Sequence, residues 1–196
     1  MNQLNAMGSS EAPESAANPK SSFTLSCYEW IEALIPALIV IMILFTFLFR
    51  VITVNGPSMM PNLVNGYKVL ISCANNHPSR GDIVVIDAKG IALHEVIVKR
   101  VIATEGQTVN IDFTIGIVSV DGVALDESAY IQNGITKNQY DISFPQKIPA
   151  GHVFVLGDNR IVSDDSRSSD VGMIDQRYII GQVKLILAPF SNFGKL

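Results

Sequence analysis

The sequence predicts a mostly β protein, in which a single N-terminal transmembrane helix precedes an antiparallel β domain with a small inserted β subdomain. Three observations lead to this prediction. One uncharged apolar run occupies residues 33–49. From Val51 onward, short β-like runs alternate with turn signals, and no useful helical periodicity follows Phe49. The 196 residues suffice for one membrane segment and one domain with its own core.

The apolar run, residues 33–49, reads ALIPALIVIMILFTFLF. A helix of this length measures about 25 Å, which is near the lower limit for spanning a bilayer. Tyr28 and Trp30 are expected to anchor it at one membrane interface and Arg50 at the other. Pro36 would lie in the first turns of this helix, where its missing N–H does little harm.

We interpret this run as a retained anchor. For a cleaved signal peptide its apolar region is too long, its leading segment is acidic, and Phe49-Arg50-Val51 is a poor cleavage sequence. A buried core helix is the other alternative, which the apolar character on every side of the run disfavours. Residues 1–32 are predicted to form a disordered tail, because residues 1–22 are rich in Ser, Ala, Asn and Pro.

The domain after the anchor, residues 51–196, contains eight candidate strands. They are Val51–Val54, Tyr67–Ser72, Asp82–Asp87, Glu95–Thr104, Thr108–Asp112, Ile115–Val120, His152–Leu156 and Ile179–Leu187. Asp121-Gly122 is a typical two-residue hairpin turn. Residues 106–150 are expected to form the inserted subdomain, a subsidiary layer of hairpins.

Composition excludes several classes of function. The net charge of −4 and the pI near 5.3 predict no basic face for nucleic acid. Cys27 and Cys73 flank the apolar run, so a spanning helix would hold them on opposite sides of a membrane. The sequence has no disulfide framework and no CxxC metal pattern. No metal or organic cofactor is implied.

The stretch Gly56-Pro57-Ser58-Met59-Met60-Pro61 is the first candidate for chemistry. Two prolines and a glycine make a rigid turn around Ser58, which suits a nucleophile. Most serines in such turns only cap or decorate them. A nucleophilic serine also needs a base, and nothing local supports His77, His94 or His152 in that role.

Lys99 is the other candidate base. In the predicted strand Glu95–Thr104 it shares a face with Ile97 and Val101. Burial between apolar neighbours favours the neutral amine, which could accept a proton near neutral pH. Alternatively, the stem of Lys99 packs on the sheet while its ammonium reaches water.

A dense polar run follows the apolar strand His152–Leu156. Within it, Ser163, Asp165 and Arg167 could form a charge-assisted group that supports a site. A solvated loop would have a similar composition.

Together these pieces resemble the type I signal peptidases, membrane-anchored Ser-Lys proteases, in the single-anchor form common in Gram-positive bacteria. Four blocks match in order: GPSMMP at 56–61, RGDIVVI at 80–86, KRVIATEG at 99–106 and GDNRIVSDDSR at 157–167. The sequence departs from the family pattern at Asn62, where threonine is usual, at Gly56, where some members have serine, and at Ile161-Val162, where polar residues are common.

The resemblance implies a role for each of these residues. Ser58 would be the nucleophile and Lys99 the general base, while Ser163 would hydrogen-bond the lysine amine and orient it. Four charged residues would hold the supporting contacts: Asp158, Arg160, Asp165 and Arg167. Gly56, Pro57 and Met59 would shape the substrate cleft and the oxyanion site.

The resemblance also implies the reaction. The enzyme would remove N-terminal signal peptides from secretory precursor proteins, cutting after small residues of the Ala-x-Ala type. Its partners would be these signal peptides, the lipid bilayer and the secretion machinery. The chain would be a single-pass protein of the cell membrane, with a cytoplasmic N-terminus and an extracytoplasmic peptidase domain.

Three other functions stay open. A self-cleaving Ser-Lys repressor would carry a DNA-binding helical domain in place of the apolar helix. A sortase-like transpeptidase would use Cys73 with His94 and Arg100. A non-catalytic β domain tethered to the membrane would act as a binding module or an inactive paralogue.

Overall fold

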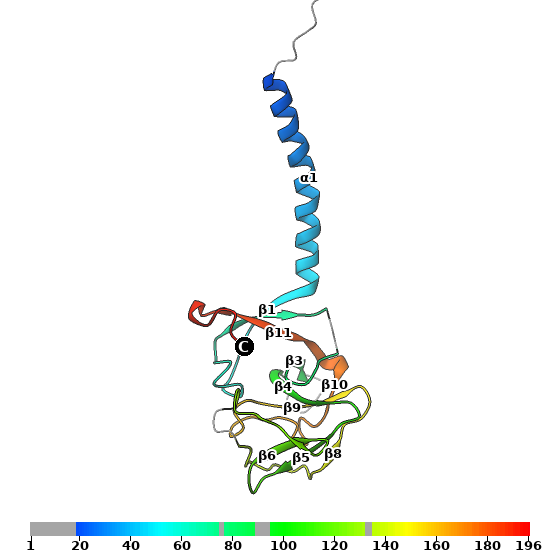
Figure 1. Ribbon diagram of the computed structural model, residues 1–196, viewed down its shortest axis with the longest axis vertical. Coiled ribbons are helices and arrows are strands. Elements are labelled where there is room, and N and C mark those ends of the chain that lie inside the picture. The colour runs from blue at the N-terminus through cyan, green and yellow to red at the C-terminus, as the bar shows by residue number, and fades with distance from the viewer. Residues whose placement is uncertain (1–18, 75–76, 89–94, 132–134) are drawn as a thin grey trace, which may run out of the picture. The chain divides into compact units, whose positions relative to one another are not determined.

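The structure is a computed structural model that describes residues 19–74, 77–88, 95–131 and 135–196. The chain divides into two compact units, with the boundary between Leu44 and Phe45. The described part of the first unit is helix, and the second unit is a β domain (Figure 1).

Helix α1 runs from Pro19 to Leu48. Its segment Tyr28–Leu48 is long and apolar enough to cross a membrane, and none of that segment is buried. A core helix would bury its apolar side chains, so the exposure of this segment excludes that alternative.

The helix begins earlier than the sequence predicted. Residues 19–32, which we expected to be part of a disordered tail, are helical; residues 1–18 lie outside the described residues. Proline fits the first helical position, and each residue added to an existing helix costs little. Pro36 therefore lies in the interior of α1 and not in its first turns.

The β domain contains two antiparallel sheets. The seven-stranded sheet has the order β1-β2-β11-β3-β4-β9-β10 and the four-stranded sheet the order β7-β6-β5-β8. The strand bounds are β1 Phe49–Thr53, β2 Lys68–Ser72, β3 Ile83–Asp87, β4 Val96–Thr104, β5 Thr108–Asp112, β6 Ile117–Val120, β7 Val123–Ala124, β8 Gln146–Lys147, β9 His152–Leu156, β10 Ile174–Asp175 and β11 Ile179–Ala188. The described residues also include the short 3-10 helices η2 Gln176–Tyr178 and η3 Phe190–Asn192.

The predicted fold class, mostly antiparallel β with one N-terminal apolar helix, is confirmed. Each of the eight candidate runs coincides with a strand whose ends differ by at most two residues. Strands β7, β8 and β10 were not predicted, because a strand of two residues is too short to show an alternating pattern.

The second sheet spans residues 108–147 and lies between β4 and β9 in the chain. These two strands pair directly, with Thr104 opposite Val153. One apolar cluster joins the second sheet to them, since Val109 and Val118 pack with Ile102 of β4 and Phe154 of β9. Figure 1 shows this sheet at the end of the β domain away from β1.

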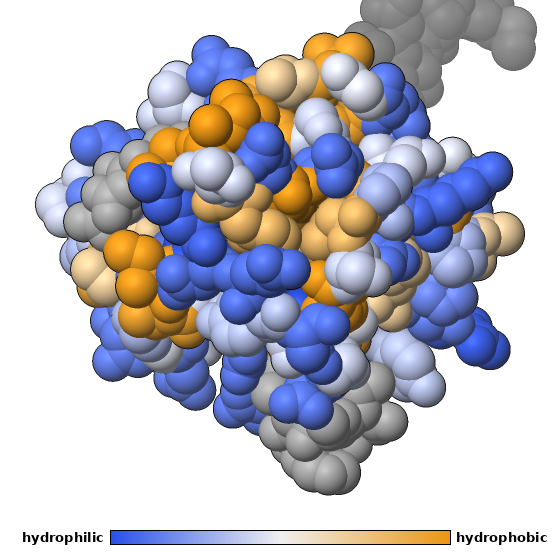
Figure 2. Space-filling model, turned by 90° about the horizontal axis from the view of Figure 1, so that it is seen from below, coloured by the Kyte–Doolittle hydropathy of each residue, from blue (hydrophilic) through white to orange (hydrophobic). Residues whose placement is uncertain are grey.

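The surface of the molecule is not uniformly polar. On the face drawn in Figure 2, apolar residues gather in several patches among hydrophilic ones. Apolar patches on a folded domain often mark contact sites.

Candidate functional site

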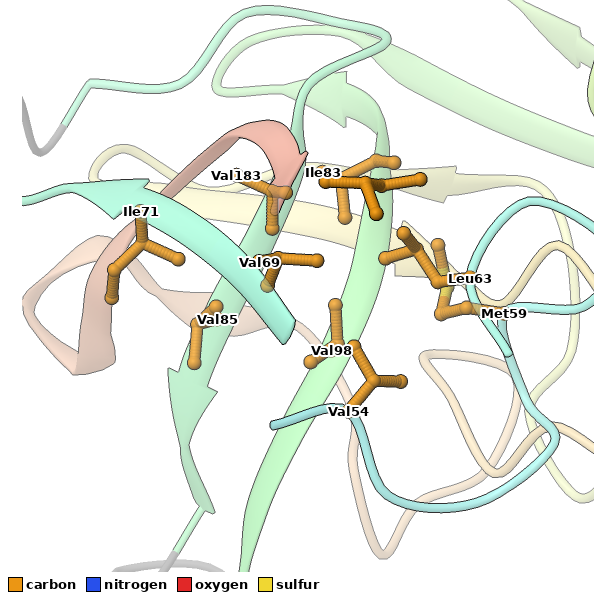
Figure 3. Packing of buried hydrophobic residues seen from close by; sticks show 10 residues of the cluster. Val54, Met59, Leu63, Val69, Ile71, Ile83, Val85, Val98 and Val183 are labelled. Atoms are coloured by element: carbon orange, nitrogen blue, oxygen red, sulfur yellow. The ribbon is translucent and has the colours of Figure 1, made fainter. Parts of the chain in front are cut away.

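The turn that carries Ser58 is held in place by packing against the core. Met59 and Leu63, on either side of cis-Pro61, are fully buried in the cluster that also contains Ile83 and Val98 (Figure 3). The carbonyl of Ser58 accepts a hydrogen bond of 2.9 Å from the N–H of Asn159. The serine is therefore held both by packing and by its backbone.

Gly56 shapes the entry to this turn. Its φ of +85° lies in the left-handed region that favours glycine, and its N–H donates to Asn65 Oδ1 at 3.0 Å. Because that N–H is already engaged and Pro57 has none, the backbone N–H of Ser58 is the donor of this turn left for an oxyanion.

Lys99 reaches Ser58 from the neighbouring strand. It lies in the middle of β4, opposite Val84 of β3, and only 3% of the residue is exposed. Its Nζ donates to Ser58 Oγ at 3.1 Å. An amine and a hydroxyl at this distance are within reach of proton transfer.

Burial shifts the pKa of this amine. Desolvation lowers the pKa of Lys99 below its ordinary value, because the ammonium loses its hydration. The carboxylates of Asp165, Asp164 and Glu95 oppose this shift. Desolvation is the larger effect, so the net shift is toward the neutral form of Lys99.

Ser58 and Lys99 open into a cavity of about 370 Å³. Two chain segments form its long walls: residues 55–58 on one side and residues 95–99 on the other, with Val162 and Asp164 completing the lining. In the described part of the chain, Val96–Lys99 pairs with β3 along one edge, while pairing with β9 begins only at Arg100. The other edge of this half-strand thus lies open beside Ser58.

Asp165 and Arg167 form a fully buried ion pair beneath the site, with a contact of 2.8 Å between Arg167 Nε and Asp165 Oδ1. The second carboxylate oxygen of Asp165 accepts the N–H of Gly157. Arg167 also donates to the carbonyls of Arg160 and Ser163. The polar run 157–167 is therefore folded around its own charges, and it is not a solvated loop.

Ser163 is fully buried, but its hydroxyl has no hydrogen-bond partner. The expected hydrogen bond to the Lys99 amine is therefore not formed, and the amine donates to Ser58. The hydroxyl lies against Gly157, where an added Cβ would come within 2.1 Å of Ser163 Oγ. This packing explains why position 157 must be glycine.

Asp158 and Arg160 take partners that the sequence did not indicate. Asp158 accepts from Arg100 Nε at 2.7 Å and from Arg100 Nη2 at 2.8 Å. Asn62 donates to the same carboxylate and to the carbonyl of Tyr130, both at 2.7 Å. The asparagine that replaces the usual threonine therefore connects the serine turn to Asp158.

Arg160 binds Glu127, which comes from the inserted segment between β7 and β8. The two Nη–Oε contacts measure 2.6 and 2.9 Å, and both side chains are buried. Arg160 also donates to the carbonyl of Gly157 and to the hydroxyl of Thr136. No pattern in the sequence pointed to Glu127, because it stands outside the four blocks that carry the resemblance.

The residues needed for a sortase-like site do not come together in the described residues. Cys73 packs against the apolar core, and Arg100 is occupied by Asp158. His94 lies outside the described residues. Within the described residues, no group of histidine, cysteine or acidic side chains could hold a metal ion.

Comparison with known proteins decides the family. A family model described as "Signal peptidase, peptidase S26" matches residues 27–188. The chain belongs to this signal peptidase family.

Several signal peptidases are similar to this chain along most of its length. Signal peptidase I of Bacillus licheniformis is 32% identical over 191 residues, covering 93% of this chain and 97% of the relative. Signal peptidase I T of Bacillus subtilis is 33% identical over 173 residues, covering 84% and 86%. A solved structure of a signal peptidase I from Enterococcus faecalis is 29% identical, covers 54% of this chain and 96% of its own, and has a TM-score of 0.41.

Signal peptidase membership supports a serine peptidase that acts in signal-peptide processing. Together with the apolar helix α1, it also indicates a membrane anchor.

Proposed function

We propose that this chain is a membrane-anchored endopeptidase that removes N-terminal signal peptides from exported precursors, with Ser58 as nucleophile and Lys99 as general base. The observation that carries the proposal is the 3.1 Å approach of the buried Lys99 Nζ to Ser58 Oγ within an open cleft. The family to which the chain belongs supports the reaction class.

In the first half-reaction, neutral Lys99 takes the Oγ proton as Ser58 forms a bond to the scissile carbonyl carbon. The negative charge on the carbonyl oxygen is stabilised by the N–H of Ser58. When the C–N bond breaks, the Lys99 ammonium returns the proton to the departing amine, which becomes the N-terminus of the mature protein.

In the second half-reaction, Lys99 is neutral again and takes a proton from water. The resulting hydroxide attacks the ester carbonyl, the bond to Ser58 Oγ breaks, and Lys99 gives its proton back to that oxygen. The signal peptide leaves as a free acid, and the enzyme is restored. No step requires a metal or an organic cofactor.

The open edge of β4 supports recognition of an extended substrate. A precursor segment lying between residues 55–57 and Val96–Val98 would pair with the free backbone groups of this edge. Side chains of an extended segment alternate in direction, so positions −1 and −3 would face the same apolar wall. Large side chains would clash there, which favours the Ala-x-Ala type of site.

Anchoring favours the same substrates. Ser58 follows the end of α1 at Leu48 by ten residues, and a precursor is held in the membrane by its signal peptide. Placing enzyme and substrate in one bilayer raises their effective concentration. We propose that the N-terminus lies in the cytoplasm and the β domain outside, where it meets precursors as they leave the secretion machinery.

The test is cleavage of a precursor by the detergent-solubilised full chain. Ser58→Ala and Lys99→Met should each abolish processing, while folding, followed by circular dichroism, is retained. Matched controls are Ser119→Ala on β6 and the exposed Lys184→Ala on β11, which should process at the wild-type rate. Normal processing by either dyad variant would reject the assignment, and a wild-type chain that binds precursor without cutting it would favour a non-catalytic module.

A further inference from the structure

In the loop of residues 157–167 most polar and charged side chains are buried, with Asp164 exposed, whereas both apolar side chains lie outside. Asp158, Arg160 and Ser163 are at most 4% exposed, whereas Ile161 is 58% and Val162 is 51% exposed. This distribution is the reverse of the usual one for a surface loop. Exposing two consecutive branched apolar side chains favours a role in contact with another molecule.

These two side chains extend the catalytic cleft. Val162 lines the cavity that contains Ser58 and Lys99. Its neighbour Ile161 lines a second cavity of about 220 Å³, together with Ile135, which is 40% exposed. The apolar surface formed by Val162, Ile161 and Ile135 thus begins at the reacting groups and leads away from them.

Polar contacts behind this apolar surface keep it in place. The amide of Asn138 donates to the carbonyl of Ile161 at 2.8 Å, and Arg167 donates to the carbonyl of Asn138 at 2.9 Å. Since Arg167 is fully buried in its ion pair with Asp165, the surface is anchored to this buried pair. Such support pre-organises a binding surface.

The course of the substrate decides which part of it meets this surface. In the proposed function, residues before the scissile bond lie along Val96–Val98, in the wall of the cavity that faces residues 55–58. The loop 157–163 meets Ser58 from another side, through the bond from the Asn159 N–H to the Ser58 carbonyl. The chain that follows the scissile bond would therefore leave across Val162 and Ile161.

We propose that Val162, Ile161 and Ile135 form a subsite for an apolar side chain among the first three residues of the mature protein. This inference rests on the proposed function and adds a specificity element on the far side of the cleaved bond. The enzyme selects precursors by their mature N-terminus as well as by the small residues before the cut.

The test uses peptides with a fixed Ala-x-Ala segment and either leucine or serine at each of positions +1, +2 and +3. The detergent-solubilised full chain should show a kcat/KM about tenfold higher for leucine at one of these positions. Ile161→Ser and Val162→Ser should bring this ratio close to one. Val123→Ser, which replaces an exposed valine of β7, should keep both the ratio and the rate.

The outcomes separate the two proposals. Cleavage by the wild-type chain without a preference at any of the three positions would overturn the subsite and leave the proposed function standing. A uniform loss of rate on every peptide in the Ile161 variant, with the preference intact, would assign the apolar surface to packing or to the bilayer and also overturn it. A wild-type chain that cuts none of the peptides would contradict the proposed function itself.

Discussion

At the scale of single residues, the charge of Lys99 controls the proposed activity. Burial lowers the pKa of this lysine, and the free amine is the form that accepts a proton from Ser58. As pH falls below that pKa the amine becomes protonated, so kcat/KM should drop about tenfold per pH unit on the acid side. A profile of kcat/KM against pH for a soluble peptide measures this limb.

The exposed Asp164, which lines the cleft, gives a specific test of this control. Its negative charge raises the pKa of Lys99, in opposition to burial. Asp164→Asn should therefore lower that pKa further and move the acid limb to lower pH. Asp170→Asn, at another exposed acid, should leave the limb in place; a shift of equal size in both variants, or a shift to higher pH, would contradict the assignment of Lys99 as base.

Local patterns in the sequence placed Lys99 between apolar neighbours and Ser58 on a rigid turn, but they left the role of each residue open. The pairing of the two was predicted from the resemblance to the signal peptidases, which joins sequence blocks that lie far apart in the chain. The hydroxyl of Ser163 was expected to bind the lysine, but its orientation depends on packing against Gly157 and is not local. Rotamer choices of this kind are decided by tertiary contacts.

At the scale of elements, the inserted segment is bound to the catalytic loop through one buried ion pair. Glu127 and Arg160 are 33 positions apart in sequence, and nothing local relates them. The strand bounds could be predicted because an alternating β run between two turns is a local pattern. The Glu127–Arg160 pair could not be predicted, since it depends on how the inserted segment folds against the catalytic loop.

This ion pair should be costly to break. Glu127→Ala would leave the buried guanidinium of Arg160 without its counter-charge, and should lower the free energy of unfolding by about 3–5 kcal/mol. The double variant Glu127→Leu with Arg160→Met should recover much of that loss, because no unpaired charge stays buried. Urea unfolding of the detergent-solubilised chain, followed by far-UV circular dichroism, measures the free energy of unfolding of both variants.

The matched control is Arg177→Ala, which breaks the exposed pair with Asp175 and should leave the free energy of unfolding nearly unchanged. If Glu127→Ala behaved like this control, the insertion would not depend on the buried pair.

At the scale of the whole molecule, the chain combines an apolar helix with a β domain. The segment Tyr28–Leu48 is expected to hold the protein in the membrane. Charged residues at the centre of a spanning helix cost about 2.5–3.5 kcal/mol each. Val40→Lys combined with Leu44→Lys should therefore release the chain from alkaline-washed membranes into the soluble fraction.

The control for this experiment is the apolar pair Val40→Leu and Leu44→Ile, which should stay in the membrane pellet. Retention of the double lysine variant in that pellet would show that α1 is not the anchor. In protoplasts, added protease should digest the β domain and spare a fragment containing α1. Full protection of the β domain would contradict the proposed orientation.

The pairing of β4 with β9 has a consequence for how such chains can vary. Thr104 and Val153 stand opposite each other, so the inserted segment between them begins and ends at neighbouring positions of one sheet. An inserted hairpin of another length could replace this segment without disturbing the pairing of β4, the strand that carries Lys99. Any such chimaera would still need an acidic residue in place of Glu127, because the guanidinium of Arg160 would otherwise be buried without a counter-charge.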